Sequence, residues 1–126
     1  MATMFLLFSH KLTNDQIVSA KEDLNCENLV YLPEELQNLW SNIPPTEEGY
    51  EHLVKFKNFI LNNYKKGDYA LIQGDWGYTY HMVNFCKEIG VIPVYSTTER
   101  NSKDIINDDG SISKISLFKH VIYKRY

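Results

Sequence analysis

Three short segments of this sequence carry residue types that could bind a phosphate and act on it. The first is Gly74-Asp75-Trp76-Gly77, which follows an apolar run and precedes a helical pattern. Backbone N–H groups at the start of a helix point outward and favour negative charge, so this segment is a candidate anion site. It is neither a complete G-x-G-x-x-G motif nor a P-loop. The alternative interpretation is a tight strand-to-helix turn that Asp75 caps.

The other two segments supply hydroxyl, guanidinium and imidazole groups. Ser96-Thr97-Thr98-Glu99-Arg100 combines three hydroxyls with a guanidinium suited to a phosphate. Ser9-His10 offers a hydroxyl and an imidazole that titrates near neutral pH. Taken alone, each has a simpler interpretation: a threonine-rich strand end with a surface arginine, and a capping or surface histidine. Asp75 is a candidate general base, although its carboxylate would repel phosphates unless it contacts ribose hydroxyls.

These segments form one site only if the elements before them end at the same edge of a sheet. The pattern predicts a strand–helix–strand unit from Ala70–Gln73, Tyr78–Ile89 and Val91–Tyr95. Ahead of this unit the sequence predicts a strand Met4–Phe8, a helix capped by Thr13 that ends near Leu24, a strand Asn28–Leu32, a helix that begins at Pro33 and a long helix from Thr46 to Tyr64. After it, the turn Asn107–Gly110 predicts a hairpin of Arg100–Ile106 and Ile112–Tyr126.

The predicted fold class is α/β. Parallel strands joined by helical crossovers give a three-layer sandwich with a mainly parallel sheet, which here ends in a C-terminal β-hairpin. We expect the strand order 2-1-3-4, which puts a topological switch point between the first and third strands. Open α/β sheets bind ligands outside the carboxyl ends of the strands at such a point. Ser9-His10 should then lie beside Gly74-Asp75, and the three segments should converge on one crevice.

Length and composition bound the class of protein. The 126 residues suit a single domain, 1–126, and the net charge of -3 gives no reason to expect a DNA partner for the chain as a whole. Cys26 and Cys86 form neither a metal spacing nor a disulfide framework, and no His/Cys/Asp/Glu cluster has the spacing of a metal site. We therefore expect no metal, reduced thiols and a cytoplasmic location. No run approaches the length of a membrane span or resembles a signal peptide, so we expect no membrane partner.

The same segments carry a resemblance to a known family. The run QGDWGYTYHMVNFCKEIGVIPVYSTTER, with FLLFSHKLT at the start and HVIYKRY at the end, resembles the CRISPR-associated Csx-twenty family of type III systems. The resemblance covers nearly the whole chain and is strongest at Gly74-Asp75-x-Gly77-x-Thr79 and Tyr95-Ser96-Thr97-Thr98-x-Arg100. Members are similar to the Rossmann-like CARF domains that bind cyclic oligoadenylates. The resemblance implies a Rossmann-like fold, a homodimer with the ligand at its interface, and ring-nuclease activity that switches off the signal.

Within that resemblance the marked residues take expected roles. A ring nuclease without metal or cofactor can use the ribose 2′-OH as internal nucleophile, so the protein supplies mainly positioning and charge. The Gly74–Gly77 and Ser96–Thr98 segments would donate hydrogen bonds, and the rings of Trp76 and Tyr78 would stack on adenine. The expected catalytic residues are His10 as proton shuttle, Arg100 and Asp75. The expected ligand-binding residues are Ser9, Gly74, Trp76, Gly77, Tyr78, Thr79, Ser96, Thr97 and Thr98.

Three alternatives to a ring nuclease stay open. The chain could bind cyclic oligoadenylate without cleaving it, as a sponge or sensor. It could bind a nucleotide or flavin unrelated to CRISPR signalling, or act as a structural interaction module. Cyclic tetra-adenylate is the expected ring, but nothing in the sequence fixes the ring size.

Overall fold

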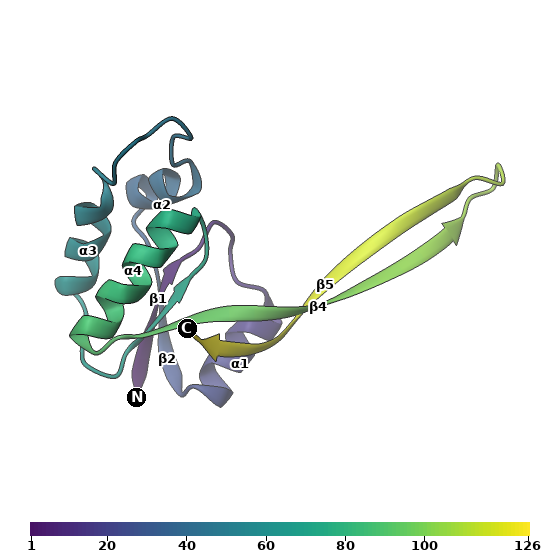
Figure 1. Cartoon of the computed structure of the whole chain (residues 1–126). Coiled ribbons are helices and arrows are strands. Elements are labelled where there is room, and N and C mark those ends of the chain that lie inside the picture. Colours follow the sequence, from purple (N-terminus) through teal and green to yellow (C-terminus); the bar gives the residue numbers. More distant parts are fainter.

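A computed structural model describes the backbone of residues 1–126 and every side chain except that of Ser116. Five strands form one sheet in the order β2-β1-β3-β4-β5, with helices on both of its faces (Figure 1). The elements follow one another as β1 (Ala2–Leu7), α1 (Asn14–Asp23), β2 (Cys26–Tyr31), α2 (Glu34–Ser41), α3 (Leu53–Leu61), β3 (Tyr69–Ile72), α4 (Trp76–Ile89), β4 (Ile92–Ile106) and β5 (Ile112–Arg125).

The predicted topology is confirmed. Strands β1 to β4 pair in parallel, and β5 joins β4 as an antiparallel edge strand. The chain moves from β1 to β2 on one side and then crosses to β3 on the other. The topological switch point therefore lies between β1 and β3, as the sequence predicts.

Alternate residues of the central strand β1 face two separate cores. Phe5 and Leu7 point to the face covered by α2, α3 and α4, where they join a cluster with Trp40. Met4 and Leu6 point to the other face, where α1 contributes residues such as Ala20. Both faces of β1 are buried, which is why Met4–Leu7 is apolar without alternation. The two cores make the three layers of the predicted sandwich.

Local capping signals place three helix ends as expected. Thr13 and Gln16 form a capping box at the start of α1. Asp75 accepts a hydrogen bond from Tyr78 N at the start of α4. Gly90 ends α4 with φ +84°, a backbone conformation that residues with a Cβ rarely adopt. The structure thus gives Asp75 the capping role named above as the alternative to anion binding.

The prediction of one long helix from Thr46 to Tyr64 is wrong. Only Leu53–Leu61 is helical, and the preceding segment forms turns, with Glu47 N bonded to Pro44 O and Leu53 N to Tyr50 O. The Glu47 carboxylate accepts hydrogen bonds from the neighbouring segment and from α4, which holds these turns in place of a first helical turn. Other bounds shift by a few residues: β2 begins two residues before Asn28, and α4 begins at Trp76.

The C-terminal hairpin is longer than predicted. Strand β4 continues without a break from Ile92 to Ile106, so Ser96–Thr98 does not leave a strand end but lies inside a strand. A register shift between Ser96 and Thr98 interrupts the β4–β5 ladder, and Thr97 Oγ1 bridges it by bonding both N and O of Ile122. Beyond this bulge the hairpin projects clear of the helices (Figure 1). We call residues 99–119 the arm.

Candidate functional site

The carboxyl ends of β1, β3 and the sheet part of β4 meet at one edge of the sheet. Gln73 N donates to Leu7 O at 3.0 Å, which brings the start of the Gly74–Gly77 loop beside the end of β1. Gln73 Oε1 accepts a hydrogen bond from Ser96 N at 2.9 Å, which ties the same residue to β4. Ser9, Gly74 and Ser96 therefore follow or flank one switch-point edge, as the sequence predicts.

Ser9 and His10 lie at the surface directly after β1. Both side chains are exposed, and the His10 ring packs edge-on against Phe8 with the ring centroids 5.5 Å apart. An exposed imidazole at the switch point can exchange protons with solvent and with a ligand at this edge. Of the histidines in the chain, His10 is the one that follows a strand at this edge.

The Gly74–Gly77 loop leads from the end of β3 directly into the first turn of α4. Thr79 N makes an intrahelical bond to Asp75 O at 2.8 Å, so the N–H groups of Trp76 and Gly77 precede the helical ladder. The Trp76 ring is 92% exposed and is free to stack on a planar ligand. The buried hydroxyl oxygen of Thr79 has no hydrogen-bond partner among the described residues.

Stacking of Tyr78 on adenine, which the resemblance suggests, is excluded in this conformation. The Tyr78 side chain is 1% exposed, and its hydroxyl donates to Glu47 Oε1 at 2.5 Å. Burial and this hydrogen bond raise the pKa of Tyr78 to about 12. Tyr78 belongs to the core beneath the loop and contributes only its edge to the cleft beside Asp75 and Gly77.

The two glycines of the loop make room for aromatic side chains. A Cβ at Gly74 would lie 2.6 Å from Nε1 of Trp40, whose indole N–H donates to Gln73 O at 3.1 Å. A Cβ at Gly77 would collide with the ring of Tyr50. The absence of a side chain at both positions is therefore explained by packing within the protein. Ligand binding by Gly74 and Gly77 remains a prediction.

A buried polar network adjoins the site on the α1 face. Ser96 Oγ lies 2.6 Å from Nδ1 of His120 and accepts a hydrogen bond from Gln16 Nε2 at 3.3 Å. Ser96 and His120 are both buried, so their hydroxyl–imidazole pair is out of reach of a bulky substrate. The Ser96 hydroxyl is committed to protein partners in this conformation.

His120 is the titratable member of this network. Burial lowers the pKa of its imidazole, although the carboxylates of Asp15 and Asp23 act in the opposite direction. Its Nε2 atom is buried and has no hydrogen-bond partner among the described residues. His120 is thus a neutral structural residue at pH 7 that joins β5 to β4 beneath α1.

Thr98 and Arg100 lie on the far side of the bulge. Both are exposed, and Arg100 places its guanidinium carbon 5.6 Å from the centroid of the Phe118 ring. Arg100 is four residues beyond Ser96, so it lies about 13 Å further along the strand at the usual rise of about 3.3 Å per residue. The expected grouping of Arg100 with Ser96 at one strand end is wrong, because β4 continues outward.

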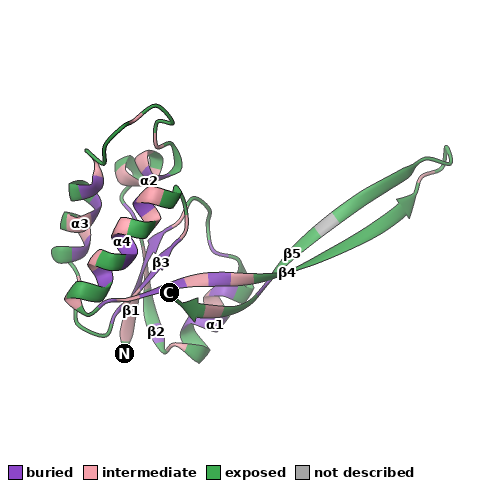
Figure 2. Ribbon diagram, in the orientation of Figure 1, coloured by how far each residue is buried: buried purple, intermediate pink, exposed green. Residues whose placement is uncertain are grey.

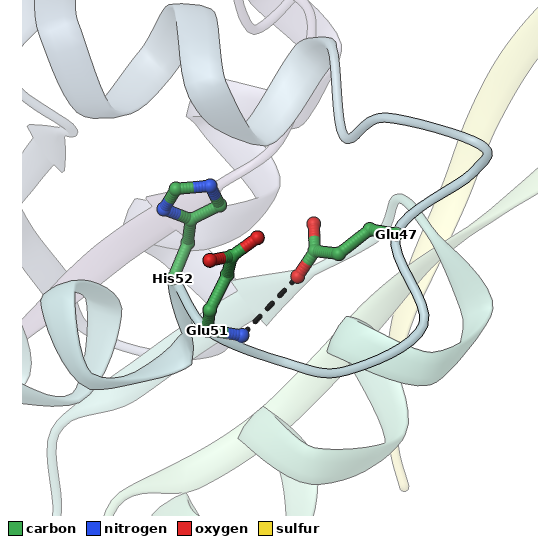
Figure 3. A group of neighbouring side chains, drawn as sticks. All are labelled: Glu47, Glu51 and His52. Atoms are coloured by element: carbon green, nitrogen blue, oxygen red, sulfur yellow. Dashed lines mark hydrogen bonds between the residues drawn. The ribbon is translucent and has the colours of Figure 1, made fainter.

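A group of three potential metal ligands occurs in the loop before α3, where the sequence interpretation expected none. One ligand atom each from Glu47, Glu51 and His52 lie within 4.8 Å of one another (Figure 3). Glu47 Oε1 also accepts a hydrogen bond from Glu51 N at 3.2 Å. Two carboxylates and an imidazole could hold a divalent cation such as Zn²⁺ or Mn²⁺. The four-residue spacing of the two glutamates is the available signal in the sequence, but it is equally compatible with the helix predicted from Thr46 to Tyr64.

Sequence reasoning also missed residues that complete the edge. Gln73 bridges β1, β3 and β4, but it looked like the last residue of an apolar run. Tyr126 lies beside the start of β4, where its N–H donates to Pro93 O, but its hydroxyl reaches the end of β3 and donates to Ile72 O. The centroid of its ring lies 5.0 Å from that of Tyr95. A C-terminal tyrosine carries no local signal for such a contact, because the contact depends on the long return of β5.

The strand order defines a doubly wound α/β protein with a topological switch point between β1 and β3. The chain belongs to the family described as uncharacterized protein MJ1673, whose model matches residues 2–124. It is 51% identical to the uncharacterized protein MJ1673 of Methanocaldococcus jannaschii, over all of this chain and 98% of that protein. No solved structure matches the chain. Within the described part of the chain, none of the helices has the length and apolar content needed to cross a bilayer.

Proposed function

We propose that this chain binds a cyclic oligoadenylate, with cyclic tetra-adenylate as the first candidate, and cleaves it without a metal to switch off type III CRISPR signalling. The proposal combines the resemblance of its motifs to the Csx-twenty family with the chemistry of the switch-point edge. The single observation that supports it most is the convergence of Ser9-His10, the Gly74–Gly77 loop and Ser96 on that edge.

The residues at the edge suit an RNA-like ligand with phosphates and bases. The N–H groups at the start of α4 favour a phosphate. Trp76 offers an exposed indole for a base, and Tyr95 with Tyr126 forms a second aromatic group beside β3. No large basic patch is needed, because a ring of a few nucleotides carries few charges.

Cleavage needs two proton transfers, one from the attacking 2′-oxygen and one to the departing 5′-oxygen. The ribose 2′-oxygen attacks the adjacent phosphorus, the bond from phosphorus to the 5′-oxygen breaks, and a 2′,3′-cyclic phosphate forms. The 2′-OH loses its proton to a base, and the departing 5′-oxygen gains one. The His10 imidazole is the candidate for these proton transfers because it is exposed directly after β1, and the N–H groups at the start of α4 would stabilise charge on the phosphate oxygens.

The size of the ligand calls for a second surface. The cleft that Asp75 and Gly77 line has a volume of about 260 Å³, and the rest of its lining comes from the loop before α3 and from Tyr78, not from Ser9, His10 or Ser96. Pockets for drug-sized ligands typically measure about 300–1,000 Å³, and a ring of four nucleotides is larger than most such ligands. The proposed binding form is therefore a homodimer that holds the ring between two switch-point edges, with the two-fold axis of the dimer matching that of the ring.

One experiment tests the proposal and its main alternative. Purified protein is incubated with cyclic tri-, tetra- and hexa-adenylate in EDTA, and the products are separated while binding is followed by gel shift. Binding with loss of the ring and formation of 2′,3′-cyclic phosphate ends is the expected result. The absence of binding to all three rings would overturn the proposal.

A binder that does not cleave is the second candidate function. It is favoured by the state of two predicted donors, because the hydroxyls of Ser96 and Thr97 are already engaged within the protein. Tight binding with an intact ring, in EDTA and equally after addition of Zn²⁺ or Mn²⁺, would select this candidate. Cleavage that appears only with added metal would instead point to the Glu47–Glu51–His52 group.

A further inference from the structure

The arm is the part of this chain whose side chains have least cover. Every described side chain from Thr98 to Ile106 is exposed, and Figure 2 shows the same exposure along the opposing part of β5. The arm has only two strands and carries no helix on either face. A two-stranded hairpin is marginally stable in water, because three strands or a packed helix are normally needed to bury its side chains. The length of this arm therefore indicates a contact outside the chain.

Both faces of the arm carry large apolar side chains, and those on one face are the more exposed. The β4–β5 register pairs Arg100 with Phe118 and Ile106 with Ile112, and these pairs lie on the same face because residues alternate along each strand. Ile106 is 78% exposed, and Ile112 and Phe118 are each 68% exposed, whereas Ile105, Ile115 and Leu117 on the opposite face are 38%, 42% and 60% exposed. Large apolar side chains gathered in this way mark interaction surfaces. We call this surface the Phe118 face.

The charges of the arm argue for a protein partner. Residues 99–119 contain four basic side chains, Arg100, Lys103, Lys114 and Lys119, and four acidic ones, Glu99, Asp104, Asp108 and Asp109. Nucleic acids and anionic membranes both require a surplus of basic groups. The arm is neutral, and opposite charges face each other in the ladder, as in the pair Asp104 and Lys114. A surface of this kind complements a copy of itself.

Interface area favours a second copy of this chain over a single unrelated contact. Eight residues from Glu99 to Ile106 span about 26 Å, and a two-stranded ribbon is about 10 Å wide, so one face projects only about 260 Å². A stable interface usually takes about 800 Å² from each partner. In a two-fold dimer that exchanges arms, each chain contributes its own arm and the surface that receives the partner's arm. Exchange thus doubles the contribution of each chain to about 520 Å², roughly two thirds of such an interface, whereas one arm on an unrelated protein supplies only about one third.

The arm is also long enough to cross a second copy. The ten residues that follow Ser96, Thr97 to Ile106, reach about 33 Å beyond it at the usual strand rise. A globular chain of this length has a radius of gyration of about 14 Å. The lysines of β5, Lys114, Lys119 and Lys124, discourage plain edge-to-edge pairing of two β5 strands, so the contact uses the Phe118 face.

We infer that this chain forms a two-fold dimer by arm exchange, in which the Phe118 face packs on the partner's body and brings Arg100 to the partner's switch-point edge. The placement of Arg100 at that edge rests on the proposed function, whereas the dimer itself does not. The arrangement explains why Arg100 belongs to the predicted ligand motif in sequence but lies away from the switch-point edge of its own chain.

Light scattering of the purified full chain tests the dimer without any ligand. The expected mass is twice the chain mass of 14.8 kDa at micromolar concentration. The double variant Ile106→Asp/Ile112→Asp should reduce it to the mass of one chain. The matched control Asn101→Asp/Ser113→Asp adds the same charges on the opposite face and should remain dimeric. A monomeric wild type, or a dimeric Ile106→Asp/Ile112→Asp variant that melts cooperatively, would overturn arm exchange.

A mixing experiment then tests whether the arm reaches the partner's site. His10→Ala and Arg100→Ala proteins are co-refolded, so that mixed dimers form. With exchanged arms, each mixed dimer holds one site with both residues intact. Cleavage of cyclic tetra-adenylate is assayed below saturation, where the weak binding of Arg100→Ala also slows it, and it recovers well above that of either variant. If Arg100 served its own chain, no site would be intact, and the absence of recovery would overturn the placement of Arg100. If the wild type cleaves no ring, the proposed function fails while the mass measurement still decides on the dimer.

Discussion

The two halves of the β4–β5 hairpin share one backbone ladder and differ in what lies over them. In the half that belongs to the sheet, Val94 and Ser96 are buried, and Tyr123 OH donates to Gln16 O on α1 at 2.9 Å. In the arm the ladder continues to the pair Ile106 and Ile112, yet these side chains are exposed. Strand pairing satisfies the backbone, but only a covering layer buries side chains. The body therefore stabilises the fold, while the arm offers a surface.

The largest expected contrast comes from removing one large aromatic side chain from each region. Trp40 is buried, the centroid of its ring lies 5.1 Å from that of Phe56, and its indole N–H donates to Gln73 O. Trp40→Ala should therefore lower the free energy of unfolding by about 3–5 kcal/mol. Phe118→Ala, on the exposed arm, should change it by less than about 0.5 kcal/mol at dilutions where the chain is monomeric. Urea denaturation measures both. Equal losses would show that the arm packs on its own body.

The next contrast separates chemistry in the body from affinity in the arm. General acid–base help is worth about a hundredfold or more in rate, so His10→Ala should keep most of the binding and lose at least that factor in single-turnover cleavage. An exposed side chain after β1 has little part in folding, and the melting temperature should stay close to that of the wild type. An unchanged rate would remove His10 from the chemistry and leave positioning by the Gly74–Gly77 loop.

Arg100→Ala is the corresponding change in the arm. A charged hydrogen bond to a phosphate contributes about 1.5–3 kcal/mol, and if it forms equally in the ground and transition states its loss weakens binding without slowing chemistry. We expect weaker gel-shift binding of cyclic tetra-adenylate and a nearly normal rate at saturating ligand. A slower rate with unchanged binding would instead make Arg100 part of the reaction. The arm would then contribute to the chemistry and not to the affinity.

Two glycines test whether the switch-point loop is shaped by packing. The Cβ in Gly74→Ala would lie 2.6 Å from the Trp40 indole nitrogen, so the indole or the loop must move at a cost of about 1–3 kcal/mol. Gly49→Ala is the matched control, because a Cβ there meets nothing within 4 Å and should change stability by no more than about 0.5 kcal/mol. Similar melting temperatures for the two variants would contradict the packing explanation.

The parts of the fold that could be predicted depend on local rules. The apolar run Met4–Phe8 marks a strand buried on both faces, and Thr13 with Gln16 marks a helix start whichever way the rest of the chain folds. Strand order followed from the rules for parallel crossovers, and with it came the pairing of Ser9 with the Gly74 loop. These features need no knowledge of distant residues.

The parts that could not be predicted depend on distant contacts. The segment before α3 has helical spacing, but the Tyr78 hydroxyl draws the Glu47 carboxylate to α4, and that bond holds the turns instead. Ser96 and His120 are far apart in sequence and meet only after β5 has returned along β4. The arm was foreseen as a hairpin but not as an extension of the strand, because Thr97 carries the ladder across the bulge.

The smallest expected effect is a pH dependence confined to the body half of the hairpin. His120 is buried and its pKa is lowered below the ordinary value of 6.5, so the unfolded chain takes up a proton at this site before the folded chain does. Its contribution to stability is therefore fully present above pH 6.5 and is lost as the pH falls below that value. One proton limits the slope to about 1.4 kcal/mol per pH unit.

Urea denaturation of the wild type and of His120→Gln between pH 7.5 and pH 5 at ~0.5-unit steps measures this slope, with the window set around the ordinary histidine value. His120→Gln keeps a polar side chain beside Ser96 and should flatten the loss of stability toward low pH. His10→Gln removes an exposed histidine and should leave the loss as it is in the wild type. If His120→Gln and the wild type lose stability in parallel, the buried imidazole is not the group that takes up the proton. The loss of stability at low pH would then come from another region of the protein. Burial of His120 under α1 would not be its cause.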